Sequence, residues 1–284
     1  MHVMYSRCCG MDVHKKVGVA CVLLTEADGS VQRQVRTFSA MTADLLACLD
    51  WLEGLQVEIV AMESTGVYWR PVFQVLEGHL KVMLVNAQHM KAVPGRKTDS
   101  KDSEWIADLL QHGLLKASFI PEQPIRDLRD LTRYRKTLIQ ERAQEVNRLQ
   151  KVLEMANLKL ASVVTDVLGK SGREMLDALM AGQRDPEALA ELARGRLRGK
   201  LPELRLALDG RLQPHQVFLL QQILAHIDFL QESLERVQQE IQERLAPFEE
   251  AITLLESLPA VLDLAAAVKL TGPPQQLVCP LAWT

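Results

Sequence analysis

The feature that most constrains this chain is a run of three strand-type segments near its N-terminus, separated only by short turns. Residues 8–13, 17–25 and 31–38 are rich in apolar and β-branched side chains, and the last segment alternates apolar with polar residues. Residues 27–30 (ADGS) form a typical turn sequence. Parallel neighbours would need crossovers of about a dozen residues or more, and these gaps are shorter. The three segments are therefore predicted to be antiparallel neighbours in one sheet.

The segments that follow alternate between helix-type and strand-type patterns. Helices are expected at 42–53 (capped by Thr42), 67–77 and 99–112, buried strands at 57–62 and 80–85, and a loop over 86–97. An antiparallel start followed by parallel strand–helix units is typical of a ribonuclease-H-like fold. We therefore predict an α/β domain of the ribonuclease-H/RuvC-like class over residues 1–120. A doubly wound parallel sheet is the alternative, and the short gaps disfavour it.

After residue 120 the pattern is almost entirely helical. Leucines recur near the helical period over 125–164, which predicts one long helix. Residues 217–245 carry a heptad pattern, with Gln231 and Gln238 in its partner seam. Residues 169–199 contain Gly, Pro and Arg and are expected to form short helices or a mobile linker. We predict a mostly α-helical coiled-coil region over 121–250, whose long helices pack on each other or on a second chain.

Composition sets limits on function. The net charge is −3 and aromatic residues make up 5%, so the whole chain shows no charge signal for nucleic acid. No run of about 18 apolar residues predicts a membrane span, and the N-terminal residues do not resemble a secretory signal. The five cysteines form no CxxC pair, which favours reduced thiols in a cytoplasmic protein over disulfides or zinc.

Four acidic residues stand where a metal-dependent site would need them. Asp12 ends the first strand, Glu63 follows the fourth, and Asp99 and Asp102 begin the helix after the fifth. The first and fourth strands are neighbours in a ribonuclease-H-like sheet, and residues three apart share one helix face. Crowded carboxylates repel one another, a divalent cation removes that repulsion, and hard oxygen ligands suit Mg²⁺ or Mn²⁺. Each residue alone is more often a structural residue, such as a turn residue at Asp12 or a helix-start acid at Asp99, but all four at matching positions favour the site.

Three blocks around these acids resemble a known family. They are residues 10–15 (GMDVHK), 62–69 (MESTGVYW) and 97–102 (KTDSKD). In this order and spacing they are similar to the DEDD motifs of the IS110 family of insertion-element transposases, over roughly residues 7–255. The resemblance implies that Asp12, Glu63, Asp99 and Asp102 are catalytic and bind Mg²⁺. It also implies recognition of donor and target DNA through a structured guide RNA, and assembly as a dimer or tetramer.

The end of the chain departs from that family. Residues 254–259 resemble the beginning of a helix-hairpin-helix, but the turn glycines are missing, and 271–284 reads like an out-of-frame ending. The family's C-terminal domain carries a nucleophilic serine, and no serine occurs after Ser257. We therefore expect residues 251–284 to be the truncated or frameshifted start of that domain. A chain without the nucleophile is not expected to complete strand exchange by the family's route.

Local clusters of basic residues suggest contacts with phosphate. The residues predicted to bind nucleic acid flank the acidic positions or form a stripe on the long helix: Lys15, Lys97, Lys101, Arg129, Arg133 and Lys136. Acids are interleaved along that helix, so a solvated helix face is an equal alternative for the stripe. Residues 194–200 hold three arginines and a lysine with no acid between them. Residues 169–171 (GKS) resemble the end of a phosphate loop but lack its preceding glycine, so they predict no nucleotide site.

These observations leave several functional hypotheses. The leading one is an RNA-guided, transposase-type site-specific DNA recombinase with a metal-binding DEDD site. The alternatives are a metal-dependent RuvC-like junction nuclease and a non-catalytic remnant that binds nucleic acid or forms oligomers. A sugar-kinase-like phosphotransferase ranks last, because the helical half offers no glycine-rich phosphate loop. The expected partners are DNA, a guide RNA and further copies of the chain, and no membrane.

Overall fold

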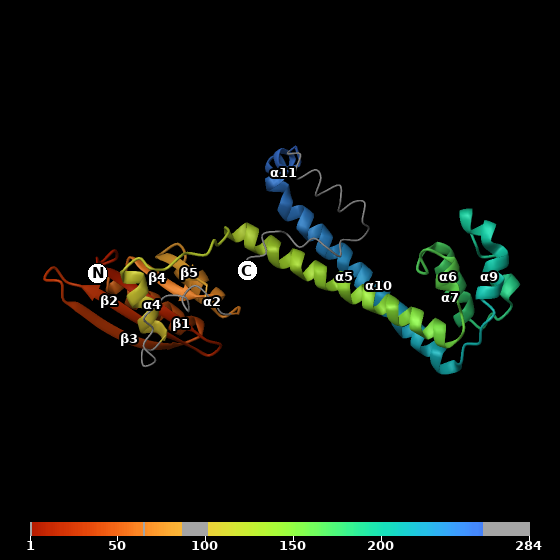
Figure 1. Ribbon diagram of the computed structural model, residues 1–284, viewed down its shortest axis with the longest axis horizontal. Helices are drawn as coiled ribbons and strands as arrows, with labels where there is room; N and C mark the ends of the chain where they lie inside the picture. The colour runs from red at the N-terminus through yellow and green to blue at the C-terminus, as the bar shows by residue number, and fades with distance from the viewer. Residues whose placement is uncertain (1, 65, 87–101, 258–284) are drawn as a thin grey trace. The chain divides into compact units, whose positions relative to one another are not determined.

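The computed structural model describes residues 2–64, 66–86 and 102–257. The chain divides into two compact units, Met1–Pro121 and Glu122–Thr284. The first unit contains a sheet with helices, and the described part of the second is helical (Figure 1).

Five strands form one sheet in the order β3-β2-β1-β4-β5. Their bounds are Arg7–Val13 (β1), Val17–Thr25 (β2), Val31–Ser39 (β3), Ile59–Glu63 (β4) and Lys81–Val85 (β5). The first three strands are antiparallel neighbours, as their short turns predict. Strand β4 pairs parallel with β1, and β5 pairs parallel with β4. The predicted ribonuclease-H/RuvC-like α/β fold is thus confirmed by the order and direction of the strands.

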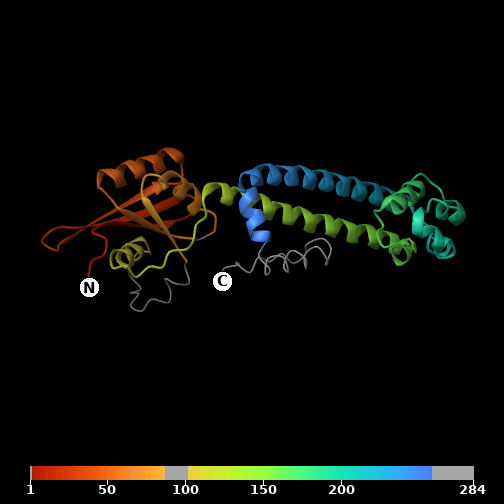
Figure 2. The same ribbon diagram turned by 90° about the horizontal axis from the view of Figure 1, so that it is seen from above.

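Helices cover both faces of this sheet. Helices α1 (Thr42–Gly54) and α2 (Trp69–Leu76) pack on one face, and α4 (Asp102–Gln111) packs on the other (Figure 2). Side chains alternate between the faces along each strand. In β1, Cys9 and Met11 join the core under α1 and α2, whereas Cys8 joins the core under α4. Even-numbered residues of β1 therefore face α4.

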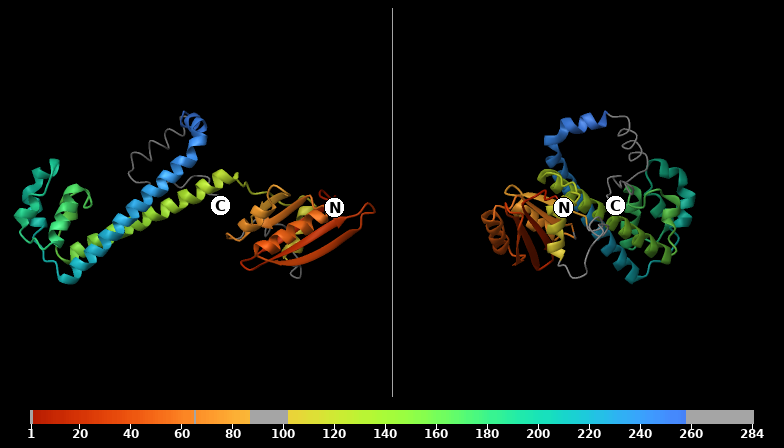
Figure 3. Two further views of the ribbon diagram at one scale, coloured as in Figure 1. Left: turned by 180° about the vertical axis from the view of Figure 1, so that it is seen from behind. Right: turned by 60° about the vertical axis from the view of Figure 1, so that its left-hand side comes forward.

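Two long antiparallel helices dominate the second unit. They are α5 (Gln123–Met155) and α10 (Pro214–Leu245), which lie side by side (Figure 3). Ion pairs give their direction, because Asp127 lies 3.3 Å from Arg244 and Glu145 lies 3.3 Å from His226. The long helices of this region therefore pack on each other within one chain.

Short helices form a hydrophobic core at one end of α5 and α10, distinct from the cores on the two faces of the sheet. They are α6 (Leu160–Val163), α7 (Lys170–Met180), α8 (Pro186–Ala190), η1 (Gly195–Lys200) and α9 (Leu201–Ala207). Met175, Leu189 and Leu204 are buried there against Leu149 of α5 and Leu220 of α10. Residues 169–199 are thus packed short helices, one of the two outcomes expected. After α10 follow η2 (Ala246–Phe248) and α11 (Glu249–Glu256).

Three local expectations were wrong. The helix expected over 125–164 ends at Met155, because Asn157 adopts a φ of 54°, which a right-handed helix does not accommodate. Thr42 does not cap α1, since Met41 is the N-cap and makes no side-chain cap bond. Gln231 is exposed and does not lie in the contact between α10 and α5, and its neighbour Leu230 is buried instead. A straight helix of 3.6 residues per turn drifts away from a seven-residue repeat, which explains this last shift.

None of the helices in the described ranges is both long enough and apolar enough to cross a bilayer.

Candidate active site

Two carboxylates meet at the ends of neighbouring parallel strands. Strands β1 and β4 are paired in register through Met11 and Met62, so the next residues along, Asp12 and Glu63, continue the two strands side by side. Met11 and Met62 are both buried under α1 and α2. Because alternate side chains face opposite sides of a sheet, Asp12 and Glu63 both face α4.

Helix α4 supplies the third carboxylate. Asp102 is its first residue, and the helix packs directly on β1 at Gly10. A methyl group at Gly10 would lie 2.2 Å from the backbone nitrogen of Ala107 and 2.4 Å from the carbonyl oxygen of Ser103. Only a residue without a side chain permits this approach. Gly10 therefore sets how closely the helix carrying Asp102 approaches the strand carrying Asp12.

The electrostatics of Asp12 reflect these neighbours. Burial is the largest influence and raises the pKa of Asp12 above its ordinary value. The negative charges of Asp102 and Glu63 raise it further, whereas His14 acts in the opposite direction. The His14 ring nitrogen Nε2 lies 3.0 Å from Asp12 Oδ2 and orients that carboxylate. Asp12 therefore lies close enough to both Glu63 and Asp102 for their charges to act on it.

Two further contacts hold α4 on the sheet. Arg33 of β3 donates to Glu104 at 2.7 Å, and Gln111 Nε2 donates to the Thr25 hydroxyl at 2.8 Å. These contacts lie near opposite ends of α4, so they fix its direction as well as its position. The Ser103 hydroxyl and the Trp105 indole N–H, on the same helix, are buried and have no hydrogen-bond partner among the described residues.

Part of the predicted site lies outside the described residues, namely Asp99, Lys97 and Lys101. Within 2–64, 66–86 and 102–257, no group of three or more His, Cys, Asp or Glu side chains is spaced to hold a metal ion. Asp12, Glu63 and Asp102 are thus brought together without forming a complete ligand cage by themselves. Their carboxylate oxygens are nevertheless the donor type that Mg²⁺ and Mn²⁺ prefer.

The comparison with protein families decides the identity of the chain. A profile described as a transposase, of the DEDD type found in IS110 elements, matches residues 9–157, which is just over half of the sequence. The chain belongs to this transposase family. The match includes the β1, β4 and α4 positions of Asp12, Glu63 and Asp102.

Solved structures similar to this transposase include two of RuvC. The Thermus thermophilus RuvC structure is 14% identical, with a TM-score of 0.30, and covers 39% of this chain and 99% of that one. The T. thermophilus RuvC in complex with a Holliday junction substrate is 13% identical, with a TM-score of 0.28 and the same coverage of both chains. No curated protein matches the transposase sequence.

The basic residues predicted to contact nucleic acid lie in both units of the transposase. Lys15 is exposed in the turn between β1 and β2. Arg129, Arg133 and Lys136 lie on α5, where Arg133 and Lys136 are exposed and Arg129 is half-buried. Arg133 lies 3.7 Å from Asp130, so its charge is partly offset. Tyr134 beside them is 54% exposed, which leaves its ring open to a partner.

Sequence reasoning missed three residues that position the candidate site. Gly10 was only part of a motif, although a glycine inside a strand pattern signals close backbone approach. The Arg33–Glu104 pair joins residues far apart in the sequence, and nothing local to either residue indicated it. One expectation also needs correction. Residues 194–200 contain no acid and are therefore expected to be an unopposed basic run, but Arg194 pairs with Glu174 and Arg198 with Glu191.

Proposed function

We propose that this chain acts on DNA as a metal-dependent, transposase-type recombinase through Asp12, Glu63, Asp99 and Asp102. The observation that carries the proposal is the convergence of Asp12 and Glu63, at the ends of paired strands, on the face covered by the helix that begins at Asp102. Membership of the transposase family supplies the reaction class. Asp99 enters through the same sequence motif, since it lies outside the described residues.

The residues of this chain have distinct roles in the proposed site. Asp12, Glu63 and Asp102 would offer carboxylate oxygens to Mg²⁺ or Mn²⁺, and a bound ion would supply charge stabilisation at a phosphodiester. His14 holds the carboxylate of Asp12 at 3.0 Å and limits its rotation. Gly10 and the Arg33–Glu104 pair keep the helix bearing Asp102 against β1. Such preorganisation lets a site act without rearranging during the reaction.

Nucleic-acid binding is the second part of the proposal. Lys15 lies two residues beyond β1, close in sequence to Asp12, and Lys97 and Lys101 lie five residues and one residue before Asp102. The Arg129, Arg133 and Lys136 stripe on α5 would bind the phosphate backbone of DNA or of a structured guide RNA. We further propose that the chain acts as a homo-oligomer.

The test uses the purified full chain with Mg²⁺ and two labelled substrates, the DNA ends of an insertion element and a four-way junction. We expect cleavage or joining that requires the divalent ion. Asp12→Asn, Glu63→Gln and Asp102→Asn should each lower the rate by at least about 100-fold, since ligand shells are sensitive to single changes. Asp50→Asn is the matched control, because Asp50 is an exposed carboxylate of α1, on the other face of the sheet.

The outcomes separate the competing functions. Cleavage confined to the four-way junction would favour a junction nuclease over a transposase. Tight nucleic-acid binding without any cleavage would favour a non-catalytic binding protein. Full activity in Asp12→Asn would overturn the assignment of the carboxylates. RNA guidance is tested separately, by comparing affinity for an element-encoded structured RNA with that for a random RNA of the same length.

A further inference from the structure

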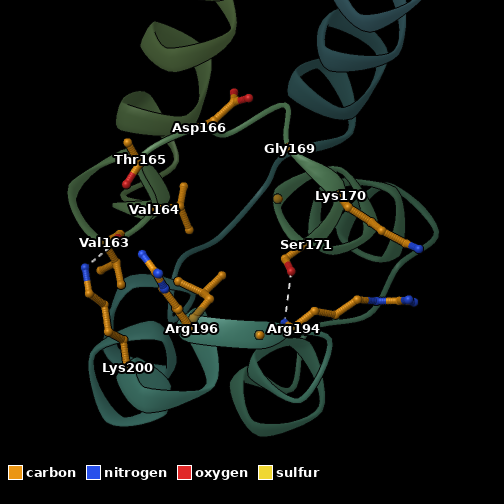
Figure 4. A pocket seen from close by; sticks show the side chains of 13 residues that line it. Val163, Val164, Thr165, Asp166, Gly169, Lys170, Ser171, Arg194, Arg196 and Lys200 are labelled. Carbon is orange, nitrogen blue, oxygen red and sulfur yellow. Dashed lines mark hydrogen bonds between the residues drawn. The ribbon is translucent and has the colours of Figure 1, made fainter.

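A cavity in the helical unit is not used by the proposed active site. It has a volume of about 480 Å³ and lies between residues 163–166, the first turn of α7 and η1 (Figure 4). We call it the basic pocket, because its lining contains four cationic side chains and one acidic side chain. The cationic residues are Lys170, Arg194, Arg196 and Lys200, and the acidic residue is Asp166.

Not all of these charges are available to a ligand. Arg194 forms an ion pair with Glu174 at 2.7 Å, which offsets its charge. Lys200 Nζ donates to the carbonyl oxygen of Val163 at 3.1 Å, which holds its ammonium group at the edge of the pocket without neutralising it. Asp166 accepts a hydrogen bond from the backbone N–H of Leu168 at 2.9 Å. The pocket therefore keeps an excess of positive charge.

Lys170 and Arg196 are the two cations with the most freedom. Both are exposed, and neither side chain forms a hydrogen bond or ion pair with any residue in the described ranges. Figure 4 shows Arg196 extending from η1 towards Val164, across the opening. The same view shows Lys170 on the opposite side, at the start of α7, with its side chain extending away from Arg196. Arg196 thus extends over the pocket, and Lys170 lines its opposite side with its charge directed outward.

The backbone around the pocket is also suited to an anion. Helix α7 has 11 residues and begins beside the pocket, and its N-cap, Gly169, makes no side-chain cap bond. The first N–H groups of a helix have no acceptor within the helix and carry partial positive charge. A methyl group at Gly172 would lie 2.2 Å from the carbonyl oxygen of Val167, so this turn is packed tightly on the preceding segment.

We infer that the basic pocket binds a backbone phosphate of a nucleic-acid strand. The excess of cations and the helix start select an anion. No aromatic side chain is among the residues that line the pocket, so nothing there would stack on a base. The contact is therefore to the phosphodiester backbone and independent of sequence. This inference rests on the proposed function, and it adds a binding region separate in sequence from the acidic site and from the stripe on α5.

The test measures binding of the full chain to labelled single-stranded RNA and duplex DNA over a range of salt, in EDTA to prevent cleavage. The double variant K170Q/R196Q removes the two free cations. We expect its Kd to rise and its salt dependence, log K against log salt, to flatten by at least about 0.7 for RNA and about 0.9 for DNA. K170R/R196K keeps both charges and should bind as the parent does.

A matched control removes two charges elsewhere. Lys81 and Arg211 are exposed and lie outside the pocket, so K81Q/R211Q should leave the salt dependence unchanged. Equal affinity and equal salt dependence of K170Q/R196Q and its parent would overturn the inference.

Calorimetry with inorganic phosphate is a separate experiment. Phosphate binding that K170Q/R196Q abolishes, with strand binding unchanged, would assign a free-anion site and also overturn it. Because no arm requires Mg²⁺, failure here is distinct from failure of the proposed catalysis.

Discussion

Gly10 of β1 lies directly against the backbone of Ala107 in α4, so closely that a single added methyl group would come within 2.2 Å of the Ala107 nitrogen. This contact joins the strand that carries Asp12 to the helix that begins with Asp102. The distance between Asp12 and Asp102 therefore depends on Gly10, a residue that has no side chain.

The first prediction concerns that contact. Gly10→Ala should push α4 away from β1, lower the free energy of unfolding by about 1–3 kcal/mol, and reduce Mg²⁺-dependent activity. Gly18→Ala is the matched control in the neighbouring strand β2, because a methyl group there would meet nothing closer than 3.9 Å. Denaturant melts and activity assays of both variants check this. Equal behaviour of the two variants would show that α4 is not positioned by Gly10.

The second prediction concerns the core of the short helices. Leu204 and Leu206 lie in the same helix, α9, but Leu204 is fully buried and Leu206 is 80% exposed. Leu204→Ala should lower the free energy of unfolding of the helical unit by about 2–5 kcal/mol, because it leaves a cavity. Leu206→Ala should change it by less than about 0.5 kcal/mol. Thermal unfolding followed by circular dichroism measures both, and similar losses would contradict the packing described.

The third prediction concerns the buried thiols of the first unit, three in the sheet and one in α1. Burial raises the pKa of Cys8 and of Cys48 to about 12 and that of Cys21 to about 11, and it raises the pKa of Cys9 well above its ordinary value. In a Cys279→Ser variant, a thiol reagent at pH 8 should therefore label no cysteine until the protein is unfolded. Rapid labelling of the folded variant would contradict the burial of these four side chains.

The same thiols predict how stability changes with pH. Their pKa values are higher in the folded state than in the unfolded state, so above about pH 9 the unfolded chain holds fewer protons than the folded one. The contribution of these thiols to the free energy of unfolding is fully present below pH 9 and is lost as the pH rises towards about 12. Urea melts between pH 8 and pH 11 should show a falling free energy of unfolding. A rise over this range would contradict the raised pKa values of the buried thiols.

The fourth prediction concerns the stripe on α5. Changing Arg129, Arg133 and Lys136 to glutamine should weaken binding of DNA and RNA alike and flatten the salt dependence by roughly 2, since each lost phosphate contact contributes about 0.7–0.9. Exchanging arginine for lysine and lysine for arginine at these positions keeps the charge and should keep the salt dependence. If the glutamine variants and the charge-keeping variants both bind as the parent does, the stripe is a solvated helix face.

Local patterning was sufficient for much of the first unit. Short turns forced the first three strands to be antiparallel, and short apolar runs marked the two buried parallel strands that follow. These patterns placed Asp12 and Glu63 at strand ends, and the strand order then made them neighbours. Such predictions succeed because turn geometry and strand periodicity depend on residues close together in the chain.

Tertiary structure decided the rest, because those relationships join residues that no local pattern connects. The close packing at Gly10, the Arg33–Glu104 pair and the neutralisation of Arg194 by Glu174 each depend on distant segments meeting. The sequence alone therefore determined the kind of fold and predicted which acids would form the site. The packing of helices on the sheet and on one another decided which charges remain free, since that depends on partners contributed by other parts of the chain.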